Sequence, residues 1–159
     1  MEELLKLLRH NALESPQNLA KMLKIDEKEV RARIEEYEKA GIIRGYQAIV
    51  NEDQLDLNTV NAVIEVKVTP EREGGFDRVA ARLSKFPEVE SMYLMSGSYD
   101  LLLFVTGRDL KQVAGFVSAR LATIEGILST TTHFMLKTYK KHGIMMETTE
   151  EHERLKVSP

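Results

Sequence analysis

Apolar residues recur every three or four positions through the first 43 residues, and this spacing predicts helices. The N-terminal part is expected to contain three of them, over residues 2–11, 15–23 and 26–40. From residue 61 the apolar positions mostly alternate or form short runs, which predicts strands joined by helices. The expected order there is strand 62–69, break 70–74, helix 76–86, strands 89–95 and 100–106, helix 109–126 and strand 127–139.

The ends of the N-terminal helices carry clear signals. Ser15-Pro16 is an N-cap followed by a first-turn proline. Asp26 with Glu29 is a capping-box pattern, and Gly41 is a C-terminal stop. Only Lys24 and Ile25 separate the second helix from Asp26. The spacing therefore predicts a helix-turn-helix, although Lys24 stands where such turns often hold glycine.

The third helix is the candidate DNA-reading element, because the second helix of this motif can lie in the major groove with its first turns facing bases. Its outward face holds Glu27, Lys28, Arg31 and Ala32, and Arg33 flanks it. The alternative is a helical pair with a solvated charged face, since short motifs produce false positives. Lys28 and Arg31 are expected to reach bases or phosphates, and Ser15, Gln17 and Arg33 to position the DNA backbone.

The second half has the strand and helix order βαββαβ, which is the ferredoxin-like order. Residues 44–50 are expected to form a preceding strand, and 51–58 a polar connector. The apolar run 100–106 is expected to be a central strand buried on both faces. In the helix that follows, the expected inward residues are Leu110, Val113, Val117, Leu121 and Ile124.

Helices cover only one face of such a sheet. The other face is expected to carry partly apolar side chains, namely Val63, Val89, Tyr93 and Met95. Because large exposed apolar patches are uncommon on monomers, we expect a homodimer formed through the sheets. The alternative is a monomer whose outer sheet face is half-polar.

Composition and charge limit the possible functions. The chain has 159 residues, 43% of them hydrophobic, and no cysteine, which excludes disulfides, thiol catalysis and cysteine metal sites. Charged residues interrupt every apolar segment, so neither a membrane span nor a signal peptide is expected, which fits a cytoplasmic protein. Net charge is −3, and residues 1–50 are neutral, with nine basic and nine acidic side chains. Since phosphate contacts drive most affinity for DNA, we expect binding by several copies together.

The ordered set of motifs resembles the Lrp/AsnC family of feast/famine transcriptional regulators. The matching stretches are LAKMLKIDEKEVRARIEEYEKAGIIRGYQAIVN, VESMYLMSGSYDLLLFVTG and EGILSTTTHFMLKTYK, within about residues 1–142. The resemblance implies an α+β fold with a winged-type helix-turn-helix domain at 1–50 and a linker at 51–61. It also implies a ferredoxin-like effector-binding and oligomerisation (RAM) domain at 62–142, followed by a tail at 143–159.

The resemblance further implies sequence-specific binding to double-stranded DNA, dimers that assemble to octamers, and a small effector, usually an amino acid. The residues that match the family's effector region are Gly97, Ser98, Tyr99, Asp100, Thr130, Thr131 and Thr132. Asp100 can accept from an ammonium group, and backbone N–H groups near Gly97, with the hydroxyls, can donate to a carboxylate. The alternative is that Gly97 only permits a positive φ and Asp100 only satisfies the turn.

Two other functions compete with an effector-responsive regulator. An amino-acid-sensing oligomer that no longer binds DNA fits the acidic third helix and the negative net charge. An enzyme is the third candidate, because some relatives decarboxylate tetrapyrroles. The sequence has no matching histidine or arginine cluster, no paired catalytic carboxylates and no phosphate loop, so we expect no enzyme, cofactor or metal. His10, His133, His142 and His152 are interpreted as structural or surface residues.

Overall fold

The structure is a computed structural model that describes residues 2–55, 57–69 and 75–146. The chain forms two compact units, residues 1–49 and 50–159. Each unit has its own hydrophobic core. No helix in the described ranges is long and apolar enough to cross a lipid bilayer.

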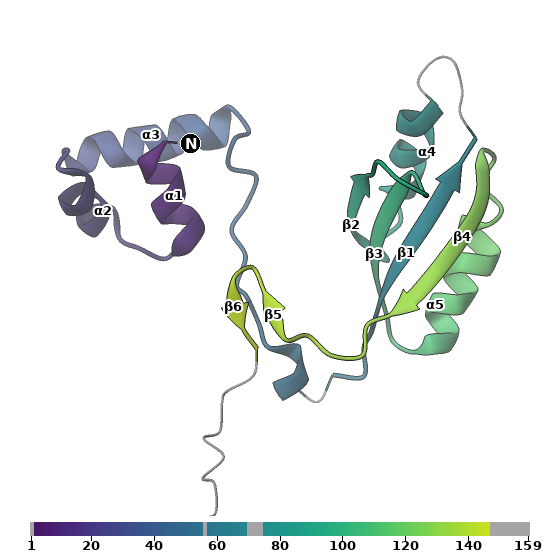
Figure 1. The fold of residues 1–159 in the computed structure, drawn as a ribbon. Helices are drawn as coiled ribbons and strands as arrows, with labels where there is room; N and C mark the ends of the chain where they lie inside the picture. The colour runs from purple at the N-terminus through teal and green to yellow at the C-terminus, as the bar shows by residue number, and fades with distance from the viewer. Residues whose placement is uncertain (1, 56, 70–74, 147–159) are drawn as a thin grey trace, which may run out of the picture. The chain divides into compact units, whose positions relative to one another are not determined.

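The N-terminal unit is a bundle of α1 (Glu3–His10), α2 (Pro16–Leu23) and α3 (Glu27–Lys39), shown in Figure 1. Its core contains one apolar stripe from each helix: Leu4, Leu8, Leu19, Ala20, Val30 and Tyr37. Ala20 is small where α2 packs on its neighbours, which lets two helices approach closely. The three-helix prediction is confirmed, and α2 and α3 form a helix-turn-helix.

The predicted caps set the ends of these helices. The Ser15 Oγ accepts from the backbone N–H of Asn18 at 3.1 Å. The Asp26 Oδ1 accepts from the N–H of Lys28 at 2.7 Å. The reciprocal half of the predicted capping box is not among the hydrogen bonds of the described residues, because the Glu29 carboxylate pairs with Arg33 instead.

The C-terminal unit contains β1 (Val60–Val68), α4 (Gly75–Leu83), β2 (Val89–Leu94), β3 (Leu101–Gly107), α5 (Leu110–Phe116) and β4 (Ile127–Phe134). A π-helical segment, η2 (Val117–Leu121), continues α5. The strands form one antiparallel sheet in the order β2-β3-β1-β4. This is the predicted ferredoxin-like arrangement.

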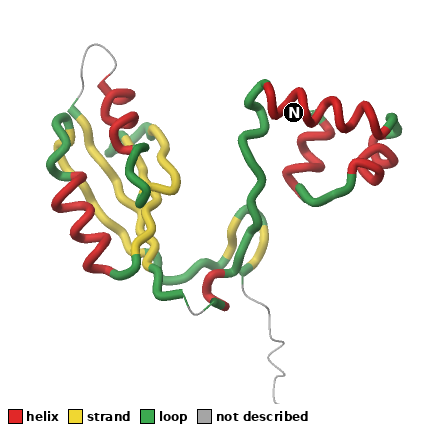
Figure 2. The backbone as a smooth tube through the Cα atoms, turned by 180° about the vertical axis from the view of Figure 1, so that it is seen from behind, coloured by secondary structure: helices red, strands yellow, loops and turns green. Residues whose placement is uncertain are grey.

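Both helices cover the same face of the sheet, which is the near face in Figure 2. The opposite face is uncovered and is turned toward the viewer in Figure 1. Strict alternation along the central strands sends every second side chain into the core, for example Ile64, Val66, Leu101 and Leu103, all at most 1% exposed. The core between sheet and helices is therefore built by the period-2 pattern read in the sequence.

Some boundaries differ from the predictions. Residues 44–50 form no regular structure and their side chains are exposed, and within the described residues none of their backbone groups pairs with a strand. The last strand ends at Phe134 instead of Tyr139, and a short hairpin follows, β5 (Lys140–Lys141) with β6 (Ile144–Met145). The predicted break at 70–74 and His152 lie outside the described residues.

The hairpin is attached to the connector that precedes β1. The Lys141 ammonium lies 2.9 Å from Glu52 Oε1, and the Asn51 amide donates to the carbonyl of the buried Met146. The hydrogen bond from Lys141 lowers the pKa of the Glu52 carboxyl. Glu52 belongs to η1 (Glu52–Gln54), a single 3₁₀ turn.

Three burial predictions for individual side chains are wrong. Leu110 is 56% exposed, because Asp109 caps α5 with Leu110 turned away from the sheet, and the unpredicted Phe116 is buried in its place. Val89 packs against the core, since a register shift between Val89 and Ser91 moves it to the helix-covered side. The strand predicted to be buried on both faces is central but buried on one face only.

Candidate DNA-binding helix and effector loop

The outward face of α3 is opposite the buried residues Val30 and Tyr37. At 100° per residue, Lys28 and Ala32 lie almost directly opposite this buried stripe, and both are exposed. The cap at Asp26 fixes the start of the helix, and its hydrogen bond is made to the backbone N–H of Lys28. The first turns of α3 therefore present an exposed face on the side opposite the core.

Arg31 lies one turn further along and is paired with Glu27. Its Nε and Nη2 donate to the same Glu27 oxygen, Oε1, at 2.9 and 2.7 Å. The Arg31 side chain is 60% exposed and that of Glu27 is 34% exposed. The pair thus lies on the surface of the first two turns of α3.

Arg33 lies on the other flank, toward α1. Its Nη1 donates to Glu2 Oε1 at 2.8 Å and its Nη2 to Glu29 Oε1 at 2.6 Å. The hydrogen bond to Glu29 is the largest cause that raises the pKa of Arg33. The buried Tyr37 hydroxyl donates to the second oxygen of Glu2. The structure therefore places Arg33 in a network that fastens α1 to α3.

The remaining sequence-predicted DNA contacts lie at the start of α2. The Ser15 hydroxyl accepts the capping hydrogen bond, and Gln17 is exposed. Two further lysines, Lys21 and Lys24, lie around the α2–α3 turn and are not among the candidates from the sequence. Both are exposed and, like Lys28, form no ion pair within residues 2–49. Their position on either side of the turn between the two helices is visible in the sequence and makes them additional candidates.

The loop between β2 and β3 contains the predicted effector residues Gly97, Ser98, Tyr99 and Asp100. The Asp100 carboxylate accepts from the backbone N–H of Val68 at 2.7 Å, and the Asp100 N–H donates to the Val66 carbonyl at 3.0 Å. Gly97 has φ +151° and no atom near the position of a Cβ. Asp100 thus fastens the loop to the end of β1, and the backbone at Gly97 is open to solvent.

The three predicted threonines do not share a face. Thr130 and Thr132 pair with the core residues Val66 and Ile64, so they lie on the helix-covered side, whereas Thr131 lies on the open side. In register, Thr130 is the nearest of the three to the loop, since its β1 partner Val66 accepts the Asp100 N–H. The structure therefore brings Thr130 toward Gly97–Asp100 but does not bring all three threonines to one site.

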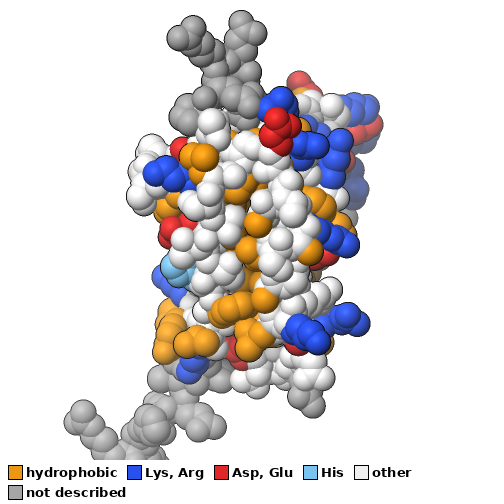
Figure 3. Space-filling model, turned by 90° about the vertical axis from the view of Figure 1, so that its right-hand side faces the viewer, with side chains coloured by type: hydrophobic (Ala, Val, Ile, Leu, Met, Phe, Trp, Pro, Cys, Tyr) orange, Lys and Arg blue, Asp and Glu red, His pale blue; other side chains and the backbone are white. Residues whose placement is uncertain are grey.

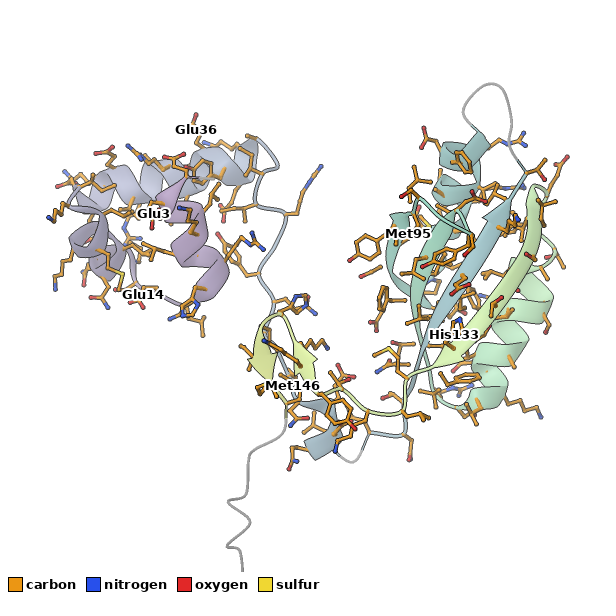
Figure 4. All side chains as sticks on the ribbon, in the orientation of Figure 1. Glu3, Glu14, Glu36, Met95, His133 and Met146 are labelled. Atoms are coloured by element: carbon orange, nitrogen blue, oxygen red, sulfur yellow. The ribbon has the colours of Figure 1, made fainter. Side chains whose placement is uncertain are left out.

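The open sheet face combines apolar and polar side chains. Tyr93 meets Phe104 edge-on with ring centroids 6.0 Å apart, and Val63 is the β1 partner of Phe104. His133 Nε2 lies 3.2 Å from Glu65 Oε1 on the neighbouring strand. Figure 4 labels His133 on this face and Met95 at the end of β2. An aromatic pair on an uncovered sheet is a typical surface for association.

A helix-turn-helix unit joined to a separate domain with an open sheet and an exposed loop defines a class of protein: DNA-binding transcriptional regulators that respond to an effector. The comparisons with known proteins agree with this class. A family model described as the Lrp/AsnC ligand binding domain matches residues 61–145, and one described as winged helix-turn-helix DNA-binding matches residues 2–44. The chain belongs to the Lrp/AsnC family of transcriptional regulators.

Relatives of known sequence or structure match almost the whole chain. The uncharacterized HTH-type transcriptional regulator YugG of Bacillus subtilis (strain 168) is 44% identical over 158 residues, which cover 99% of this chain and 95% of YugG. The Neisseria meningitidis regulator NMB0573, solved as an L-Met complex, is 25% identical with a TM-score of 0.70, covering 89% of this chain and 93% of that one. E. coli AsnC is also 25% identical, with a TM-score of 0.67 and coverage of 87% and 91%.

Proposed function

We propose that this regulator binds operator DNA as a homodimer with α3 in the major groove, and that an amino acid bound near Gly97–Asp100 changes its assembly or its affinity for DNA. The DNA-binding part of this proposal is supported by the exposed side chains on the first two turns of α3. Lys28 and Arg31 are exposed there, on a helix whose start is capped by Asp26 and whose other side is buried.

The DNA contacts divide by chemistry. Lys28 and Arg31 reach base edges or phosphates, whereas Ser15 and Gln17 contact the backbone near the start of α2. Arg33 acts chiefly by holding α3 against α1 through Glu2. Lys21 and Lys24 supply further phosphate contacts. Because the N-terminal unit has no net charge, affinity depends on this local basic face and on presenting two copies together.

The homodimer forms through the open faces of two sheets. The supporting observation is the row of apolar side chains there, Tyr93, Phe104, Leu102 and Val63, on a face that no helix of the described residues covers. Figure 3 shows further apolar side chains on the surface of one side of the molecule. Leu128 on β4 is among the exposed large apolar residues. They support assembly of dimers into an octamer.

The effector is an amino acid. The relative NMB0573 was solved as a complex with L-Met, which supports this class of ligand. In this chain the open backbone at Gly97 and the hydroxyls of Ser98 and Thr130 supply donors for a carboxylate, and Asp100 supplies an acceptor for the ammonium. Tyr99, Thr131 and Thr132 are the remaining candidates around the ligand.

The testing experiment is binding of the purified full-length protein to its own upstream DNA, titrated across salt, with and without a panel of amino acids. We expect retention of that fragment with a steep salt dependence, and a change in affinity with one or a few amino acids. The double variant Lys28→Ala, Arg31→Ala should lose affinity, while the control Lys39→Ala, at the far end of α3, should lose little. If neither this fragment nor pooled genomic fragments are retained at low salt, the proposed DNA binding is refuted.

One observation favours a second candidate, an amino-acid-sensing oligomer that does not bind DNA. Arg31, Arg33 and Lys39 each pair with a carboxylate, which leaves α3 poorly attractive to phosphate. A protein that binds an amino acid by calorimetry but retains no DNA fragment at low salt would support this candidate.

A further inference from the structure

We infer that Glu27 is a positioning residue for base recognition: it holds the Arg31 guanidinium so that its terminal edge hydrogen-bonds to a guanine in the major groove. This inference rests on the proposed DNA binding. It adds which base Arg31 recognises and which residue positions the Arg31 side chain. Arg31 is exposed and Glu27 is half-buried beside it on the first two turns of α3, which is where a recognition helix contacts base edges.

The hydrogen bonds of the pair use only one edge of the guanidinium. Nε and Nη2 both donate to Glu27 Oε1, at 2.9 and 2.7 Å. A guanidinium has five N–H donors in a plane. The remaining edge, formed by Nη1 and the second N–H of Nη2, has no acceptor within residues 2–49. Two parallel donors in one plane match the O6 and N7 acceptors of guanine.

The negative charge of Glu27 is unexpected on a surface proposed to bind DNA. A carboxylate on the DNA-facing turns repels phosphates, so Glu27 lowers affinity for every sequence. It also fixes a side chain that is otherwise free to rotate, and an arginine held in its binding geometry loses less entropy on contact. Glu27 is therefore expected to lower the affinity for DNA of any sequence and to improve discrimination between bases.

A second pair on the same helix provides a matched control. Lys39 Nζ lies 2.6 Å from Glu35 Oε1, with the same four-residue spacing as Glu27 and Arg31. A lysine ammonium has no planar fork, and Lys39 ends the helix, far from its first turns. Glu35→Ala removes one negative charge from an exposed part of α3, as Glu27→Ala does, without touching Arg31.

The experiment uses the full-length protein and a pool of random duplexes. Selection with the wild type gives the preferred duplex, and each of its guanines is then replaced by adenine in separate probes. Dissociation constants are measured for the wild type, Glu27→Ala, Glu27→Gln, Arg31→Lys and Glu35→Ala, with circular dichroism as a check on folding. The quantity compared is the ratio of affinities for the guanine and adenine probes.

We expect one guanine position in each half-site at which Glu27→Ala and Arg31→Lys reduce the ratio about tenfold, with Glu27→Gln between wild type and Glu27→Ala. Affinity for unrelated DNA should rise in Glu27→Ala. Glu35→Ala should change the affinity for all probes little and by the same factor, and leave the ratio unchanged. If both Glu27 variants keep the wild-type ratio at every guanine, the inference is wrong although the proposed function stands. If the wild type binds no duplex at low salt, the proposed function fails, and this inference with it.

Discussion

Replacing Lys24 by glycine should stabilise the N-terminal unit. Lys24 ends α2 with φ 57° and ψ 41°, in the centre of the left-handed region, and its N–H donates to the Ala20 carbonyl. This conformation costs a residue with a Cβ about 1–2 kcal/mol. Glycine avoids that cost but loses roughly 0.5–1 kcal/mol more conformational entropy on folding. The side chain is exposed and unpaired within residues 2–49, so we expect a net gain of about 0.5–1 kcal/mol in the free energy of unfolding.

The same substitution should weaken DNA binding. If Lys24 contacts one phosphate in each protomer, a dimer loses two such contacts. The slope of log affinity against log salt concentration should then become less steep by about 1.8, since each phosphate contact contributes about 0.9. Stability and DNA affinity therefore move in opposite directions, which a simple folding defect cannot produce.

Two measurements test this prediction. Denaturant unfolding followed by circular dichroism gives the change in stability, and fluorescence anisotropy of a labelled operator duplex at several salt concentrations gives the slope. Lys24→Ala is the control, because it removes the charge but keeps the Cβ, so it should lose DNA affinity without gaining stability. An unchanged salt slope in both variants would refute the phosphate contact, and a less stable Lys24→Gly protein would refute the strain argument.

Three further predictions concern other contacts. Tyr37→Phe removes the hydroxyl that donates to Glu2 and should cost about 1 kcal/mol of unfolding free energy. Burial, together with this hydrogen bond, raises the pKa of Tyr37 to about 12. The contribution of the protonated hydroxyl to stability is therefore complete below pH 10 and lost between pH 10 and about 12. Unfolding measured across this pH range tests the expectation. Phe104→Glu should convert the dimer to a monomer in light scattering, whereas Leu110→Glu on α5 should not. Asp100→Asn should keep most of the fold's stability and lose amino-acid affinity by calorimetry, and equal affinity in both proteins would remove Asp100 from the ligand site.

Features specified by local chemistry could be predicted from the sequence. Ser15 and Asp26 cap their helices as expected, and the alternating residues Ile64 and Val66 fill the core. In each case the signal lies within a few residues: a hydroxyl or carboxylate beside free N–H groups, or a period-2 pattern on a strand. The order of the two domains followed from the change of period near residue 61, and the family resemblance agreed with it.

Features that depend on distant partners could not be predicted in this way. The ion pair of Arg33 with Glu2 joins residues 31 positions apart, and no residue near Arg33 in the sequence indicates it. Val89 was assigned to the wrong face, because a single-residue register shift reverses every side chain before it. Residues 44–50 have the composition of a strand, yet a strand requires a neighbour that sequence pattern alone does not provide.

The contacts of Glu52 join the two ends of the C-terminal unit, because Glu52 and Lys141 both belong to it. Its connector, which leads to the helix-turn-helix, is held at Glu52 by Lys141, 89 residues further along, and at Asn51 by the carbonyl of Met146, 95 residues further along. A chain shortened before residue 140 would keep every strand of the sheet and still release the segment next to the helix-turn-helix. A deletion of residues 140–146 therefore also removes contacts of the connector at residues 51–54. A loss of DNA binding after such a deletion does not by itself show that the deleted residues contact DNA.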